Sequence, residues 1–174
     1  MPVVLQDRQR VVALDRVWLR RTAEAVLSAA RADNAELSLV LVSDRRMRAL
    51  NRRYRKKDGA TDVLAFPLTP TLSPAGRGKE NISSPPSGER TKVRGQKPPM
   101  LLGDVVISIE TAKRQASEFG HSLCDEVARL LVHAVLHLMG YDHERGPRDA
   151  ALMARKEQAI LKALGGRVRV GVQE

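Results

Sequence analysis

The chain has 174 residues, 43% of them hydrophobic and 29% charged, which favours one soluble globular domain with a sizeable core. Its single cysteine excludes an internal disulfide framework, and no run approaches the roughly 20 apolar residues that span a membrane. The formal net charge of +10 favours a polyanionic partner, RNA or DNA above all. The opening residues, MPVVLQDRQR, lack the apolar core of a secretory signal, so we expect a cytoplasmic protein without membrane contact.

The first third of the chain alternates strands with helices. Residues 2–6 predict a short strand, and residues 16–32 place six apolar side chains at the spacing of one helix face. Residues 36–43 alternate and then run apolar, as a half-buried strand does. Ser43 or Asp44 can cap a helix that runs to about Tyr54.

A segment of low complexity, residues 69–100, interrupts two predicted strands at 61–68 and 102–109. It holds six of the nine prolines, four of the twelve glycines and no aromatic residue. Such a segment buries too little apolar surface to offset its ordering entropy, so we expect a disordered insert in an oversized hairpin loop. Six basic residues against two glutamates give it a net charge of +4, which leaves +6 on the rest of the chain. Two origins are open: a translated DNA inverted repeat placed in a tolerant surface loop, or an RNA-binding arm.

Three helices are predicted after the insert. The first, over about 110–119, ends at Gly120, the second covers about 123–139, and the last begins at Pro147 and ends at Gly165. Because strands and helices are interspersed, we expect an α/β fold of mixed type, with a small mixed central sheet of about four strands packed with about five helices. We expect residues 1–174 to form one compact domain around the insert.

Three of the four histidines lie in one apolar stretch, HAVLHLMGYDH. His133 and His137 are four residues apart and therefore share a helix face. Gly140 can end the helix and reverse the chain, which would bring His143 back toward the other two. Two histidines at this spacing more often only pack or cap a helix, but the glycine and the third histidine favour a metal site. Three neutral imidazoles with an open fourth position are typical of catalytic zinc, so we expect one Zn²⁺ per chain.

Residues near the histidines indicate which reaction the metal would catalyse. Asp142 could orient one of the imidazoles. Zinc proteases of the H-E-x-x-H type carry a glutamate base after the first histidine, and Ala134 at that position argues against peptide hydrolysis. Phosphodiester cleavage needs positive charge instead, and residues 51–62 offer Arg52, Arg53, Arg55, Lys56 and Lys57. We expect Arg55 to bind a phosphate, although a solvated helix end would explain the same cluster.

The histidine stretch resembles the H-G-x-L-H-L-x-G-Y-D-H signature of the YbeY family, bacterial ribosomal RNA maturation factors also described as single-strand-specific endoribonucleases. Two further blocks, LNRRYRKKDGATDVLAFPL at 50–68 and LLGDVVIS at 101–108, are similar to family blocks in the same order. The resemblance covers about residues 36–164, apart from the insert. Ala134 replaces the family's glycine and Ala65 replaces a serine.

The resemblance implies zinc ligands at His133, His137 and His143, and an arginine important for activity at Arg55; we take these four as the catalytic residues. It implies a compact α/β fold and a zinc-dependent endoribonuclease that matures the 3′ end of small-subunit ribosomal RNA and takes part in ribosome quality control. The implied partners are single-stranded ribosomal RNA and the small ribosomal subunit. Two alternatives stay open: a non-enzymatic ribosome assembly factor with a structural metal, and a metal-dependent hydrolase of another substrate, such as peptide.

Overall fold

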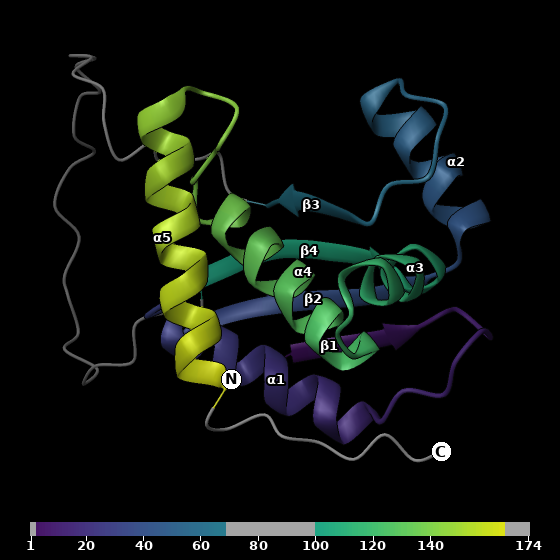
Figure 1. Ribbon diagram of the computed structural model, residues 1–174, viewed down its shortest axis with the longest axis horizontal. Helices are drawn as coiled ribbons and strands as arrows, with labels where there is room; N and C mark the ends of the chain where they lie inside the picture. Colours follow the sequence, from purple (N-terminus) through teal and green to yellow (C-terminus); the bar gives the residue numbers. More distant parts are fainter. Residues whose placement is uncertain (1–2, 69–99, 166–174) are drawn as a thin grey trace, which may run out of the picture.

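The computed structural model describes residues 3–68 and 100–165, so the disorder and RNA-arm predictions for the insert lie outside the described residues, apart from Met100. The elements are β1 (Val3–Asp7), α1 (Arg16–Ala29), β2 (Ala35–Val42), α2 (Asp44–Arg55), β3 (Val63–Pro67), β4 (Met100–Ser108), α3 (Ile109–Phe119), α4 (Leu123–Leu138) and α5 (Pro147–Leu164) (Figure 1). None of the helices in these two ranges is long and apolar enough to cross a bilayer.

The four strands form one mixed sheet in the order β1-β2-β4-β3. β1, β2 and β4 run parallel, whereas β3 pairs antiparallel with β4 and forms an edge of the sheet. The antiparallel pair is the one predicted on either side of the insert. The predicted α/β fold of mixed type, with about four strands and five helices, is confirmed.

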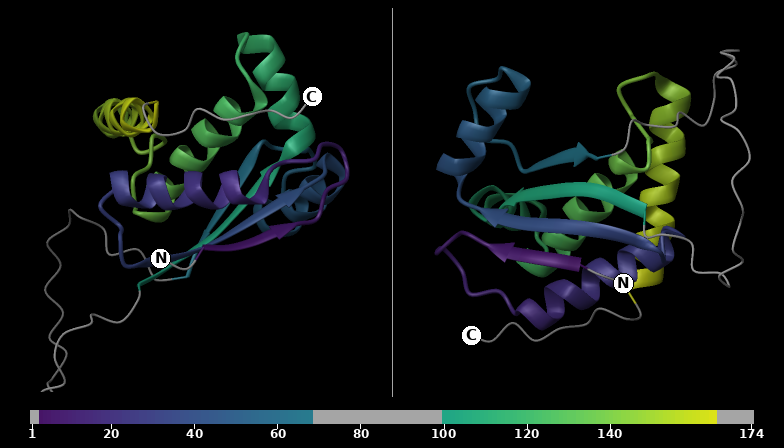
Figure 2. Two further views of the ribbon diagram at one scale, coloured as in Figure 1. Left: turned by 90° about the horizontal axis from the view of Figure 1, so that it is seen from below. Right: turned by 180° about the vertical axis from the view of Figure 1, so that it is seen from behind.

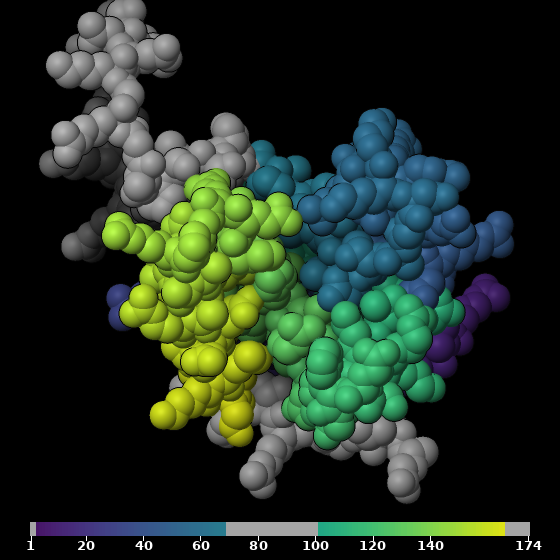
Figure 3. Space-filling view, turned by 45° about the horizontal axis from the view of Figure 1, so that its top comes forward, coloured from purple at the N-terminus to yellow at the C-terminus, as the bar shows by residue number. Residues whose placement is uncertain are grey.

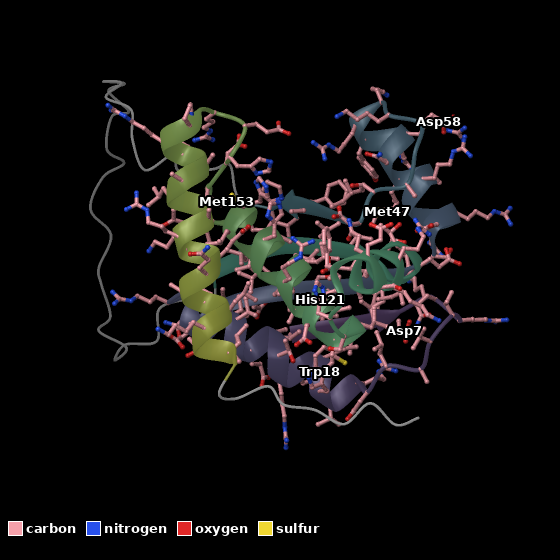
Figure 4. The ribbon with its side chains drawn as sticks, viewed as in Figure 1. Asp7, Trp18, Met47, Asp58, His121 and Met153 are labelled. Atoms are coloured by element: carbon pink, nitrogen blue, oxygen red, sulfur yellow. The ribbon has the colours of Figure 1, made fainter. Side chains whose placement is uncertain are left out.

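Helices α1 and α4 cover one face of the sheet, and α5 packs against both of them (Figure 2). The alternation of β2 explains this layer, because Leu37, Leu39 and Leu41 are buried against these helices while the residues between them are only half-buried. α4 lies centrally, and ten of its sixteen residues are buried, so its histidines are carried by a core element. Met153 of α5 is 1% exposed and lies on the side that meets α4 (Figure 4).

The opposite face of the sheet is covered by α2 only at one end. There Met47 packs with Val42, Leu64 and Val106 in a separate small core. The start of α2 is bound to β4 and α3 through Asp44, whose carboxylate accepts hydrogen bonds from Ser108, Thr111 and Arg114. Burial acts to raise the pKa of Asp44, but these hydrogen bonds outweigh it and hold the pKa below its ordinary value.

The other end of α2 is bound to the loop that leads into β3. Arg48 donates two hydrogen bonds to Asp58, at 2.7 and 2.9 Å, and the Asn51 amide donates to the Gly59 carbonyl at 2.8 Å. Lys56, with φ of 58°, ends the helix. Both ends of α2 are therefore held, and this matters because the last turn of α2 borders the site described below.

Gly103 allows β3 and β4 to approach closely. Its φ is 145°, and an added Cβ would lie 2.3 Å from the Phe66 carbonyl oxygen and 2.9 Å from a methyl group of Leu138. The register between β2 and β4 shifts at this point, so that the chain of β4 contains one extra residue, as in a β-bulge. Only glycine fits this conformation and this contact.

Candidate metal centre

The ends of α4 are set by local sequence. Ser122 and Asp125 form a reciprocal capping box, the Asp125 backbone N–H donating to the Ser122 hydroxyl oxygen at 3.1 Å. Gly140, with φ of 91°, follows the last turn, and the Tyr141 N–H donates back to the Leu136 carbonyl at 3.0 Å. The chain therefore reverses directly after the helix, as the sequence predicts.

This reversal brings the three histidines together. One ring nitrogen from each of His133, His137 and His143 lies within 4.8 Å of the others. The Nε2 atoms of His133 and His137 are 3.1 Å apart, and the ring centroids of the three residues are separated by 4.6 to 5.3 Å. In the described part of the chain, no other group of three or more His, Cys, Asp or Glu residues converges in this way.

A carboxylate that the sequence did not single out holds the first imidazole. Glu157 of α5 lies 2.6 Å from Nδ1 of His133, and this hydrogen bond lowers the pKa of Glu157 despite its partial burial. A carboxylate at Nδ1 leaves Nε2 directed toward the other two rings, which is the usual arrangement behind a metal ligand. Asp142, which the sequence suggested for orienting an imidazole, forms no hydrogen bond to a histidine within the described ranges; its carboxylate accepts from the Glu144 N–H at 2.9 Å and pairs with Arg145 at 3.4 Å.

The donor set suits a metal ion. Burial, and then the neighbouring rings of His133 and His143, lower the pKa of His137, which favours the neutral imidazole that binds metals. Three neutral nitrogen donors match the ligand preference of zinc, and they would also accept nickel or copper. The three histidines therefore fit the zinc ion that the sequence predicts.

The histidines lie on one wall of a cleft of about 590 Å³. The opposite wall is formed by the last turn of α2, the loop after it and the edge strand β3 (Figure 3, blue, facing the light green start of α5). Of the five basic residues predicted as a phosphate-binding cluster, only Arg55 lines this cleft. Arg53 instead places its guanidinium 5.5 Å from the ring centroid of Tyr54.

Two further features shape the cleft. Asp62 faces it with a carboxylate that is held by the Gln115 amide at 3.1 Å and by the Val63 N–H at 2.8 Å. Ala134, beside His133, is 1% exposed and also lines the cleft. A side chain at position 134 therefore faces the site, and the alanine there leaves the cleft without the glutamate base of zinc proteases.

Comparison with known proteins shows which family the chain belongs to. The family model described as Endoribonuclease YbeY matches residues 5–165. The chain belongs to the YbeY family. This confirms the family and the enzyme class that the sequence predicted, since the family's description is that of a nuclease.

Relatives named Endoribonuclease YbeY match over most of the chain. Those from Anaeromyxobacter dehalogenans and Pelotomaculum thermopropionicum are 45% and 41% identical, covering 90% and 94% of this chain and 69% and 97% of the relatives. The YbeY of Aquifex aeolicus is 41% identical, over 93% of this chain and 91% of its own length. A solution structure of TM1509 from Thermotoga maritima has a TM-score of 0.57 at 20% identity, with 94% of this chain and 89% of that chain covered, and supports the fold alone.

Proposed function

We propose that this chain is a zinc-dependent endoribonuclease that cuts single-stranded RNA, with His133, His137 and His143 as the zinc ligands and Arg55 as the phosphate-binding residue. The observation that carries the proposal is the cleft in which three converging imidazoles face this arginine. Membership of the YbeY family and the net charge of +10 support RNA as the substrate.

Some residues of the site would hold the zinc ion, and another would bind the phosphate of the RNA. Glu157 fixes the ring of His133, so that Nε2 is presented to the ion. A bound zinc ion supplies Lewis-acid chemistry, polarising a phosphoryl oxygen and lowering the pKa of water. Arg55 is exposed at the last position of α2 and can donate two parallel hydrogen bonds to a phosphate in the cleft. It would thereby stabilise the negative charge that develops as the phosphodiester is attacked.

The finer role that we propose is maturation of the 3′ end of small-subunit ribosomal RNA and ribosome quality control, in the cytoplasm and in contact with the small subunit. The resemblance to the family carries this part. Mapping the 3′ ends of small-subunit RNA in cells whose only copy is the His137→Ala variant tests it: extended ends support the role, and normal ends refute it.

The biochemical test combines metal analysis with cleavage of a labelled single-stranded RNA, with and without chelator. We expect His137→Ala to lose both zinc and cleavage while its circular dichroism and thermal midpoint are retained. Arg55→Ala should keep zinc and cleave roughly 100-fold more slowly, as for loss of one donor to a developing oxyanion. Arg52→Ala is the matched control, because Arg52 is on the same helix turn and is not among the residues that line the cleft.

Two results would overturn the proposal. Cleavage by His137→Ala at the wild-type rate would show that the histidine group is not the catalytic centre. Unfolding on removal of the metal, without any RNA cleavage by the loaded protein, would indicate a structural ion in a non-enzymatic assembly factor.

A further inference from the structure

The face of the sheet opposite α4 carries a row of exposed or partly exposed side chains, of which two are polar, one is aromatic and one is aliphatic. In register across the four strands, this row is Val4, Ser38, Asp104 and Phe66. The next row is Gln6, Val40, Val106 and Leu64. Seen from behind, the strands lie in front and, among the described elements, only α2 borders this face, at one end (Figure 2, right).

A groove of about 420 Å³ runs over this face. α2 forms its rim with Arg46, Leu50 and Tyr54, which are four residues apart and share one helix face. Arg8, directly after β1, lies on the other side. The floor, formed by the sheet, is mixed, with three polar and four apolar side chains, and two arginines lie at its margins.

The groove adjoins the metal cleft. Tyr54 and Phe66 line both of them, with ring centroids 5.1 Å apart in an edge-to-face arrangement. Tyr54 is 56% exposed, so its ring is accessible to a ligand that crosses from the cleft to the groove over the protein surface. An aromatic pair at this position is a stacking surface for nucleobases.

The charges of the groove suit a nucleic-acid strand. Arg8 and Arg46 are exposed, and neither forms a salt bridge with another residue in the described ranges. Asp104 is the single acidic residue of the lining, and it lies on the floor beside Ser38 rather than at the margin. A carboxylate there would repel a phosphate but can accept a hydrogen bond from the exocyclic amine of a base.

We propose that single-stranded RNA extends from the metal cleft past Tyr54 and Phe66 onto the open face of the sheet, with its phosphates paired to Arg8 and Arg46 and its bases against the floor. The inference rests on the proposed endoribonuclease function and adds a binding surface for the nucleotides that flank the cut. Open sheet faces with aromatic side chains bind unstacked bases in other RNA-binding folds, because the strands present side chains at a spacing that splayed bases can follow.

The test measures binding of the full chain, loaded with zinc, to two fluorescein-labelled oligocytidines, whose bases carry an exocyclic amine. One probe has about three nucleotides and fills only the cleft; the other has about twelve and can cover the groove as well. Anisotropy is read before cleavage, and gels verify that the probe is intact. The variant is Arg8→Ala/Arg46→Ala, and the control is Arg20→Ala/Arg21→Ala, which removes the same charge from exposed positions of α1.

We expect the groove variant to bind the long probe at least tenfold more weakly than wild type and the short probe within twofold. The slope of log affinity against log salt for the long probe should fall by about 1.4, the value for two lost contacts to a single strand. The control should change neither. Cleavage of the short probe by the groove variant should stay at the wild-type rate.

Three outcomes would overturn the inference, and they separate it from the proposed function. Equal affinity of groove variant and wild type for the long probe would refute the RNA path alone and leave this face to another class of partner, such as a protein. An equal loss of affinity for the long probe in the groove variant and the control would show that the effect arises from net charge and not from the groove. Failure of wild type to bind or cut either probe would refute the proposed function, and the path with it.

Discussion

The contact between Glu157 and His133 leads to a sharp prediction for metal affinity. A carboxylate only accepts hydrogen bonds, so it selects the imidazole tautomer with hydrogen at Nδ1 and leaves the Nε2 lone pair for a metal. Glu157→Gln keeps the shape of the side chain but allows the amide to donate, which removes this selection. Loss of such a contact typically weakens metal binding 10- to 100-fold. Because both side chains are 26% exposed and solvent screens the pair, we expect the lower end, about tenfold or ~1.4 kcal/mol.

The assay is competition for zinc between the full chain and a chromogenic chelator at neutral pH. Asp149→Asn is the matched control, because it removes one negative charge from an exposed position in the first turn of the same helix. The control should bind zinc as wild type does. A Glu157→Gln variant that folds normally and binds zinc with unchanged affinity would refute the role assigned to this carboxylate.

Three further predictions concern stability. Gly103→Ala should lower the free energy of unfolding by about 3 kcal/mol, because the added Cβ is strained and overlaps with backbone. The control Gly59→Ala, with nothing within 4 Å of its added Cβ, should lower it by less than about 0.5 kcal/mol. Denaturant titration measures both values. Asp44→Asn should lower the free energy of unfolding by about 2 kcal/mol near pH 6. Because folding lowers the pKa of Asp44 from 3.8, this difference from wild type should persist above pH 3.8 and vanish as the pH falls through the folded-state pKa. A difference that is the same at every pH would contradict the hydrogen bonds assigned to the Asp44 carboxylate. Met153→Ala should cost about 3 kcal/mol by leaving a cavity between α5 and α4, against less than about 1 for the exposed Leu152→Ala, and equal thermal shifts would contradict this packing.

Local patterns were sufficient for the secondary structure. Every predicted strand and helix is present with bounds shifted by up to about three residues, because the apolar period and the caps act within a few residues of each other. Gly120 in the left-handed region at the end of α3 and Pro147 at the start of α5 are two such signals. The family assignment also came from contiguous motifs, which the family model then confirmed.

Contacts between distant segments were beyond these patterns. Glu157 is 24 residues from His133 and has no local signal that distinguishes it from any other acidic residue on a helix. Asp142 was the plausible candidate by proximity, yet it caps the turn that follows α4 instead. The sequence also could not tell which of five neighbouring basic residues reaches the site, because their directions depend on where α2 ends and how it is held.

The sequence by itself determined the helices and strands, the histidine spacing and the chain reversal at Gly140, because each depends on backbone preferences and on side chains within one or two turns. The tertiary structure alone decided that β3 lies at an edge beside the histidines, that α5 places Glu157 behind His133, and that Tyr54 and Phe66 lie between the cleft and the groove on the sheet. These features arise from packing of apolar faces, and such packing is non-directional, so many arrangements of the same elements would satisfy the local pattern equally well.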